Sequence, residues 1–193
     1  MRAWPRKVKT GPPVPTAFLD RDGVLNRNRP GVYVTRPDQV KLYASAAPAL
    51  RLMAAKGYRL VILTNQSGVA RGYMTLAQAL AINMKLLRDL RLRGAAVDAV
   101  YFCPHGPGEK CSCRKPEPGL IREANKESPA DMKRSFMAGD KKSDLALARR
   151  AGIKGYLVLT GAWRSAGPAA AAEGYKSLLA LARSLPDYKR RTI

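Results

Sequence analysis

Five short apolar segments recur along the chain, and each is followed by a polar or glycine-containing turn and then by a longer helical pattern. The segments are rich in β-branched or aromatic residues, as buried strands are. They cover residues 16–19, 58–64, 98–102, 134–139 and 156–160. The helical patterns cover residues 46–56, 75–93, 117–127, 142–151 and 174–184. Strands that alternate with helices predict right-handed crossovers and a parallel sheet buried on both faces.

The longest helical pattern, at residues 75–93, has signals at both ends. Thr75 is a suitable N-cap, Gly94 is a suitable stop, and four leucines between them recur at helical spacing. At 193 residues the chain is long enough for one α/β domain and too short for two ordinary domains with a hinge. We therefore predict a single α/β domain of the Rossmann-like class, with a central parallel sheet flanked by helices on both faces.

The two ends of the chain differ from its middle. Residues 1–15 are basic and proline-rich, and residues 188–193 are basic. We predict that both are loosely held arms around a domain at residues 16–187. The first residues lack the apolar central run of a secretory signal, and no apolar stretch approaches the length of a membrane span. We therefore expect a cytoplasmic protein with no membrane segment.

The charge of the chain is strongly unbalanced. It holds 35 lysines and arginines against 14 aspartates and glutamates, a net charge of +21. Such a charge predicts attraction to anions, whether phosphorylated metabolites, nucleic acid or an anionic membrane surface. No basic block is interleaved with aromatic residues, which make up only 7% of the chain, so a stacking surface for single strands is not indicated. We favour a solvated basic surface over a nucleic-acid site.

Two of the scarce acids stand together in "FLDRDGVLN", directly after the first predicted strand. Asp20 and Asp22 are followed by Gly23, and this excludes the EF-hand calcium spacing, which needs a third ligand before the glycine. A solvated turn is the simplest alternative. However, Thr64 closes the second predicted strand and Asp140 follows the fourth. Because ligands of parallel sheets bind at the carboxyl ends of the strands, we expect these groups to converge on one pocket.

The expected pocket combines acids suited to Mg²⁺ with hydrogen-bond donors suited to phosphate. The segment "VILTNQSGVARG" offers hydroxyl, amide and backbone N–H donors at Thr64, Asn65, Gln66, Ser67 and Gly68. The segment "AGDKKSD" offers Asp140, Lys141 and Asp144. This combination indicates phosphoryl transfer. The chain contains no "GKS" or "GKT", and this excludes a P-loop kinase.

Four segments, "DRDGVLN", "LTNQS", "CRKP" and "GDKKSD", resemble in order the four motifs of the haloacid dehalogenase (HAD) superfamily of phosphatases, over about residues 16–161. The resemblance implies that Asp20 attacks phosphorus and becomes an aspartyl-phosphate, while Asp22 protonates the leaving alkoxide and then activates water. It further implies that Thr64 and Lys115 hold the phosphoryl oxygens. Mg²⁺ is expected between the Asp20 carboxylate, the backbone carbonyl of Asp22 and Asp140.

All three cysteines and the only histidine lie in "CPHGPGEKCSC". Three thiolates and an imidazole at C-x-H-x5-C-x-C spacing predict a closed tetrahedral zinc set in a loop at residues 103–113, made of Cys103, His105, Cys111 and Cys113. The odd cysteine count argues against disulfides, and buried unliganded cysteines remain the alternative. With four protein ligands the zinc is expected to be structural. It would fix Arg114 and Lys115, the next residues along the chain.

The zinc loop resembles two HAD phosphatase families, the D-glycero-D-manno-heptose 1,7-bisphosphate 7-phosphatases and the histidinol-phosphate phosphatases. We favour the first, because the chain carries no dehydratase domain and has no room for a large cap over the pocket. In that family the loop after the first motif contacts substrate, and in this chain it carries Asn28, Arg29, Pro30 and Gly31. Arg114 is expected to recognise a second phosphate, and Lys141 to contact substrate near the metal.

The expected ligand is therefore a small phosphorylated sugar, and the protein is expected to be a monomer. Three alternatives stay open. One is a histidinol-phosphate phosphatase, and another is a phosphatase acting on nucleic-acid ends, which the charge of +21 suggests. The third is a zinc-stabilised protein that binds polyanions without catalysis. It is disfavoured because a binder of polyanions gains nothing from the acids Asp20, Asp22 and Asp140 in its cleft.

Overall fold

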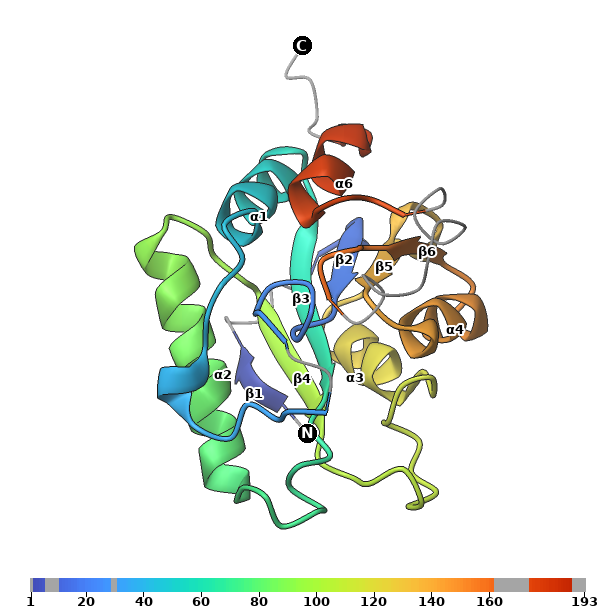
Figure 1. Cartoon of the computed structure of the whole chain (residues 1–193). Helices are drawn as coiled ribbons and strands as arrows, with labels where there is room; N and C mark the ends of the chain where they lie inside the picture. The colour runs from blue at the N-terminus through green and yellow to red at the C-terminus, as the bar shows by residue number, and fades with distance from the viewer. Residues whose placement is uncertain (1, 6–10, 29–30, 162–173, 189–193) are drawn as a thin grey trace.

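The computed structural model describes the whole chain except residues 1, 6–10, 29–30, 162–173 and 189–193. Within these limits the strands form one six-stranded sheet in the order β1-β4-β3-β2-β5-β6 (Figure 1). The strands are β1 Arg2–Pro5, β2 Thr16–Leu19, β3 Arg59–Asn65, β4 Ala99–Cys103, β5 Phe136–Gly139 and β6 Lys154–Leu157. Strands β2 to β6 all run parallel, so the predicted parallel sheet is confirmed.

Strand β1 is the main departure from the sequence prediction. It pairs antiparallel with β4 at the edge of the sheet, with Arg2 opposite Tyr101 and Pro5 opposite Ala99. Part of the segment predicted to be a loose arm therefore belongs to the sheet. Val14 also joins the body of the protein, because its carbonyl accepts a bond from the backbone N–H of Asp131 at 3.0 Å. The boundaries of a domain at residues 16–187 stay a prediction.

The C-terminal boundary also differs at one residue. Tyr188, which the sequence analysis assigned to the basic tail, packs its ring on Tyr58 with centroids 5.3 Å apart. Its backbone N–H donates to the carbonyl of Lys56 at 2.8 Å. Tyr188 is therefore part of the folded body, and residues 189–193 lie outside the described residues.

All five predicted helices are present. They are α1 Ala46–Ala55, α2 Leu76–Leu92, α3 Gly119–Glu127, α4 Lys142–Arg150 and α6 Leu178–Ser184, with 3₁₀ turns η1 Pro37–Gln39 and η2 Met132–Arg134. Thr75 caps α2 as predicted, because its hydroxyl accepts from the N–H of Gln78 at 3.1 Å. Helix α6 starts later than predicted because Ser177 caps it, accepting from the N–H of Ala180 at 3.2 Å. Among the described helices, none is long and apolar enough to cross a membrane.

The sheet is covered on both faces, as its alternating side chains require. Ala17 and Leu19 of β2 belong to a core cluster with α1, α2 and α6. Phe18, which points the other way, belongs to a second cluster with α3 and α4. In Figure 1, α1 and α2 lie on the left of the sheet and α3 and α4 on the right. Burial on both faces fixes the register of β2, and with it the position of the residues that follow its carboxyl end.

Candidate active site

One cleft of about 460 Å³ lies where the loops leave β2 and β3. It gathers the predicted catalytic and substrate residues that the structure describes. These lining residues are Asp20, Asp22, Asn28, Gly31, Thr64, Asn65, Gln66, Ser67, Arg114, Lys115 and Lys141. The predicted residues Arg29 and Pro30 lie outside the described residues. Residues of distant motifs therefore line one cleft, and Asp140, which is not in its lining, lies beside it in a cluster with Asp20.

Asp20 stands directly after β2 and is 2% exposed. Its backbone N–H donates to the carbonyl of Ala138 on β5 at 2.9 Å. Its Oδ1 accepts from the backbone N–H of Arg21 at 2.8 Å and lies 2.8 Å from the Nζ of Lys115. The sheet and two donors thus hold this carboxylate in one orientation.

Lys115 is the centre of the buried charge. Its Nζ lies 2.8 Å from Asp20, 2.7 Å from Asp144 and 2.9 Å from the carbonyl of Leu63. Because an ammonium group has three N–H donors, all three are engaged. In this structure the three donors thus face carboxylate and carbonyl oxygens. The contact of Lys115 with phosphoryl oxygens stays a prediction.

Burial by itself would raise the pKa of Asp20, but the charges of Lys115 and Lys141 outweigh it and leave that pKa below its usual value. Burial likewise opposes the charge on Lys115, yet Asp144 and Asp20 raise the pKa of its ammonium. Asp144 differs, because burial dominates and raises the pKa of its carboxyl. Asp20 is therefore ionised at neutral pH, as a carboxylate nucleophile must be.

Asp20, Asp140 and Asp144 form a cluster of buried oxygen ligands, with one carboxylate oxygen of each within 4.8 Å of the others. An all-oxygen set suits Mg²⁺. Two glycines make room for Asp140. A Cβ on Gly23 or on Gly161 would lie 2.0 Å from an Asp140 carboxylate oxygen, and Gly23 also has a φ of 93°. The backbone is therefore shaped around this carboxylate.

The side chain of Asp22 is held by two neighbours. Its Oδ2 accepts from the Arg21 guanidinium at 2.6 and 3.1 Å, and its Oδ1 accepts from the Nδ2 of Asn26 at 3.1 Å. Arg21 is 2% exposed and Asn26 is 1% exposed. The Asp22 carboxylate is not part of the cluster of Asp20, Asp140 and Asp144. The predicted contact of Asp22 with Mg²⁺ would therefore be made by its backbone carbonyl only.

The phosphate donors predicted after β3 have different surroundings. Among the described residues, the buried Oγ1 of Thr64 has no hydrogen-bond partner, as expected of a hydroxyl that awaits a ligand. Asn65 instead exchanges two hydrogen bonds of 3.0 and 3.1 Å with the backbone of Lys115. The side chain of Asn65 therefore positions Lys115 rather than serving as a free phosphate donor. The Oγ of Ser67 lies 3.2 Å from the hydroxyl oxygen of Tyr33, which also lines the cleft.

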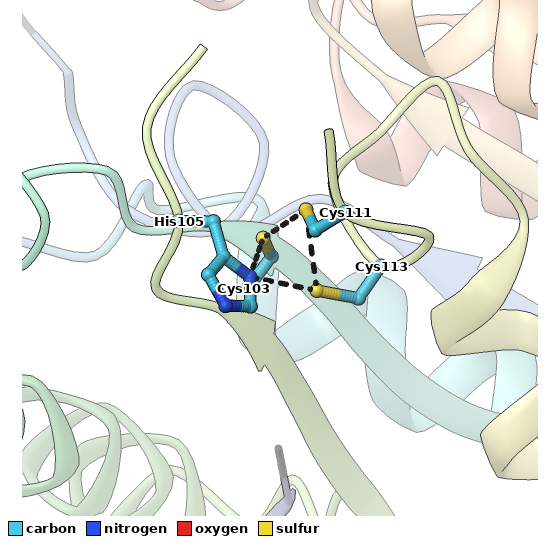
Figure 2. A group of neighbouring side chains, drawn as sticks. All are labelled: Cys103, His105, Cys111 and Cys113. Atoms are coloured by element: carbon cyan, nitrogen blue, oxygen red, sulfur yellow. Dashed lines mark hydrogen bonds between the residues drawn. The ribbon is translucent and has the colours of Figure 1, made fainter. Parts of the chain in front are cut away.

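The predicted zinc ligands converge, as Figure 2 shows. The sulfurs of Cys103 and Cys111, and those of Cys111 and Cys113, are 3.7 Å apart. The Nδ1 of His105 lies 3.5 Å from the Cys103 sulfur and 3.2 Å from the Cys113 sulfur. Tetrahedral zinc with bonds of about 2.3 Å to sulfur separates its sulfurs by about 3.8 Å. The four side chains therefore have the spacing of a zinc set, and Arg114 joins the loop by donating to the carbonyl of His105 at 3.1 Å.

Three residues around the cleft were not predicted as site residues. Asp144 was noted in the sequence but not assigned a role, although it stands one helical turn after Asp140. Arg21 lies between the two motif aspartates. Asn83 interrupts the apolar face of α2, and a buried amide on such a face is the sequence signal that could have singled it out.

The comparisons with known proteins agree with this geometry. A D-glycero-beta-D-manno-heptose-1,7-bisphosphate 7-phosphatase of Pasteurella multocida is 44% identical over 151 residues, which span 75% of this chain and 81% of that protein. The enzyme of the same name from Helicobacter pylori J99 is 41% identical over 144 residues, 74% of this chain and 82% of that protein. The chain belongs to this family of phosphatases.

Two further comparisons concern the fold of this phosphatase. The "HAD-hyrolase-like" family model matches residues 112–181. The crystal structure of D,D-heptose 1,7-bisphosphate phosphatase from B. bronchiseptica, complexed with magnesium and phosphate, superposes with a TM-score of 0.78 at 36% identity. The match covers 88% of this chain and 96% of that one. The HAD fold and the phosphatase class predicted from the four motifs are therefore confirmed.

Proposed function

We propose that this phosphatase removes the 7-phosphate of D-glycero-D-manno-heptose 1,7-bisphosphate, the substrate named for its relatives. The observation that carries the proposal is a cleft with two separate places for phosphate. One lies at the Asp20–Lys115 ion pair and at the hydroxyl of Thr64, which has no hydrogen-bond partner in the described part of the chain. The other is Arg114, which lines the same cleft and is tied to the loop of the cysteine cluster.

In this proposal Asp20 attacks phosphorus, and the bond to the departing alkoxide breaks as the aspartyl-phosphate forms. Lys115 lowers the repulsion between Asp20 and the phosphate dianion, and Thr64 donates its free hydroxyl to a phosphoryl oxygen. Mg²⁺ bound by Asp20, Asp140 and the backbone carbonyl of Asp22 would supply further positive charge to the phosphoryl group. Asp22 gives a proton to the leaving alkoxide and then takes one from the water that releases phosphate.

Arg114 is proposed to bind the phosphate that does not react. Its planar guanidinium suits a phosphate, and binding energy from a remote group can orient the reacting one. We therefore expect kcat/KM for heptose 1,7-bisphosphate to exceed that for histidinol phosphate by at least about tenfold, or about 1.4 kcal/mol of transition-state binding. Arg114→Ala should erase most of this gap and barely change turnover of a small monophosphate, as steady-state kinetics would measure.

Arg122→Ala, which removes an exposed arginine of α3 outside the cleft lining, is the matched control and should keep the gap. Each variant should be assayed at equal zinc content, because Arg114 contacts the loop. If histidinol phosphate or a 3′-phosphorylated oligonucleotide is the faster substrate of the unaltered protein, the heptose assignment is wrong. The HAD phosphatase class would still hold.

We also propose that Cys103, His105, Cys111 and Cys113 bind one structural zinc ion. The spacing of their sulfur and nitrogen atoms supports this, and four protein ligands leave no open position for catalysis. Zinc would fix a glycine- and proline-containing loop that has little core of its own, and thereby the approach of Arg114 to the cleft. A cytoplasmic location and a monomeric state remain predictions from the sequence.

Elemental analysis should find about one zinc per chain, and the zinc should remain when Mg²⁺ is removed with a weak chelator. Cys111→Ser should lose zinc, lower the melting temperature and weaken the bisphosphate preference through Arg114. Ser112→Ala changes the exposed residue between two ligands and should keep the full zinc content. A Cys111→Ser protein with full zinc and full stability would rule out the site.

A further inference from the structure

Asn83 is a polar residue in the middle of the buried face of α2. It is fully buried, and the other buried residues of that helix are Ala79, Ile82, Leu86 and Leu90. Burying an amide is costly unless its oxygen and nitrogen are both hydrogen-bonded. Both hydrogen-bond partners of the Asn83 side chain line the active-site cleft.

Arg21 and Gln66 are the two partners of Asn83. The Nη1 of Arg21 donates to the Oδ1 of Asn83 at 2.8 Å, and the Nδ2 of Asn83 donates to the Oε1 of Gln66 at 2.7 Å. The same guanidinium holds Asp22 through Nε and Nη2. Because arginine can only donate, the Asn83 oxygen must face it, and this fixes the orientation of both amides.

The hydrogen-bond network of Arg21, Asn83 and Gln66 ends at an N–H donor of Gln66. With its oxygen occupied by Asn83, Gln66 is left with its Nε2, which is buried and has no partner among the described residues. Gln66 is 1% exposed and lines the cleft, and its backbone N–H is fixed by the carbonyl of Cys103 at 2.8 Å. A buried N–H donor in a phosphate cleft calls for an acceptor oxygen from the ligand.

We infer that Asn83 is a positioning residue for the general acid Asp22 and for the substrate donor Gln66. It locks the Arg21 guanidinium, which orients the Asp22 carboxylate, and it turns the N–H of Gln66 toward an oxygen of the bound phosphate ester. The Asp22 carboxyl and the bound phosphate ester would thereby keep a fixed distance and orientation relative to each other. This inference rests on the proposed function in one respect, that Asp22 protonates the leaving oxygen.

The test compares leaving groups in the full-length protein loaded with zinc and Mg²⁺. Asn83→Leu keeps the size of the side chain and removes both hydrogen bonds. For heptose 1,7-bisphosphate, whose alkoxide needs a proton, the pre-steady-state rate of leaving-group release at saturating substrate should fall by about 10- to 100-fold, part of the 10²–10⁴-fold typical of general acid catalysis. For p-nitrophenyl phosphate and acetyl phosphate, whose leaving groups depart unprotonated, the same pre-steady-state rate should fall by less than about threefold, because only the later hydrolysis of the aspartyl-phosphate then needs Asp22.

Asn83→Asp is the second variant. It keeps an acceptor for Arg21 but cannot donate to Gln66, so the Gln66 amide should turn its oxygen toward the cleft and raise KM for every phosphate ester. Asn125→Leu, the same replacement in α3 outside the cleft lining, should leave all kinetic constants near those of the unaltered protein.

Equal falls in the pre-steady-state rate of leaving-group release for the alkyl and the activated esters would overturn the inference and leave Asn83 a purely structural role. An unchanged KM in Asn83→Asp would remove the part assigned to Gln66. If the unaltered protein does not hydrolyse the heptose bisphosphate, the proposed substrate fails, and ribose 5-phosphate then serves as the alkyl ester. The comparison of leaving groups therefore tests the role of Asn83 whether or not heptose 1,7-bisphosphate is the substrate.

Discussion

Asp20→Asn is expected to lower phosphatase turnover by about 10⁴-fold or more, as the loss of a covalent nucleophile typically does. The carboxylate stands at the end of β2, held by the N–H of Arg21 and by Lys115, with its pKa below the usual value. An amide of the same shape keeps the packing but cannot attack phosphorus. Release of phosphate from heptose 1,7-bisphosphate measures the effect, and mass spectrometry of quenched reactions should find phosphate on Asp20 of the unaltered protein and none on the variant.

Asp131→Asn is the matched control. Asp131 caps η2 by accepting from the N–H of Arg134 at 3.3 Å, and it does not line the cleft. Because asparagine caps helices as well as aspartate does, this variant should keep full turnover. Substantial turnover by Asp20→Asn that survives removal of contaminating phosphatase would exclude Asp20 as the nucleophile, and Asp22 would then be the next carboxylate to test.

The position of Asp20 could be predicted because the local pattern is strong. A buried apolar strand, Thr16–Leu19, runs directly into the acids, and two further strand ends carry Thr64 and Asp140. The parallel-sheet rule then places all three at one edge without any knowledge of side-chain contacts. The cysteine cluster was equally accessible, since metal ligands are recognised by residue type and spacing.

Strand β1 could not be predicted in the same way. Its residues, Arg2–Pro5, show no alternation of apolar and polar positions, and a proline lies at its end. The strand exists only through its pairing with the open edge of β4, a contact across almost a hundred residues. Edge pairing of this kind depends on which strand the rest of the fold leaves exposed, and the local sequence does not contain that information.

The network of Arg21, Asn83 and Gln66 was hidden for a related reason. Asn83 is separated from Arg21 by 62 residues and from Gln66 by 17, so no short motif contains the three. The partners of the Asn65 side chain were hidden in the same way. It stands among phosphate donors in the sequence, but its carboxamide is committed to the backbone of Lys115. Residue type and spacing predicted which side chains surround the cleft, whereas hydrogen-bond partners had to come from the structure.

Lys115→Met is expected to lower the free energy of unfolding by about 3–5 kcal/mol in buffer without Mg²⁺, the typical cost of leaving buried charges without their partner. The side chains of Lys115, Asp20 and Asp144 are all at most 3% exposed, and the ammonium lies within 2.8 Å of both carboxylates. Methionine fills the space of the lysine stem but leaves two buried carboxylates facing each other. Urea unfolding of both proteins at equal zinc content, in buffer without Mg²⁺, measures the change.

Lys141→Met is the matched control for stability. Lys141 is 41% exposed and its Nζ lies 3.8 Å from Asp20 and from Asp140. Water screens such a pair, so its removal should cost less than about 1 kcal/mol. A loss from Lys141→Met as large as that from Lys115→Met would show that general charge in the cleft, and not the buried contacts of Lys115, stabilises the fold.

The cost of Lys115→Met should also depend on pH, and the direction follows from the carboxylates. In the unaltered protein the lowered pKa of Asp20 contributes stability above the ordinary value of about 3.9, and this contribution is lost as the pH falls through the folded pKa. Without Lys115, burial is expected to raise the pKa of Asp20 and to raise further the pKa of Asp144, which is already raised in the unaltered protein. The folded variant then binds protons more tightly than the unfolded chain and gains stability as the pH falls. The difference between the two proteins should therefore be largest near pH 7.5 and much smaller near pH 4.5, by about 1.4 kcal/mol for each pKa unit regained. A difference that stays constant over this range would mean that Lys115 does not stabilise the fold through its charge on the two carboxylates.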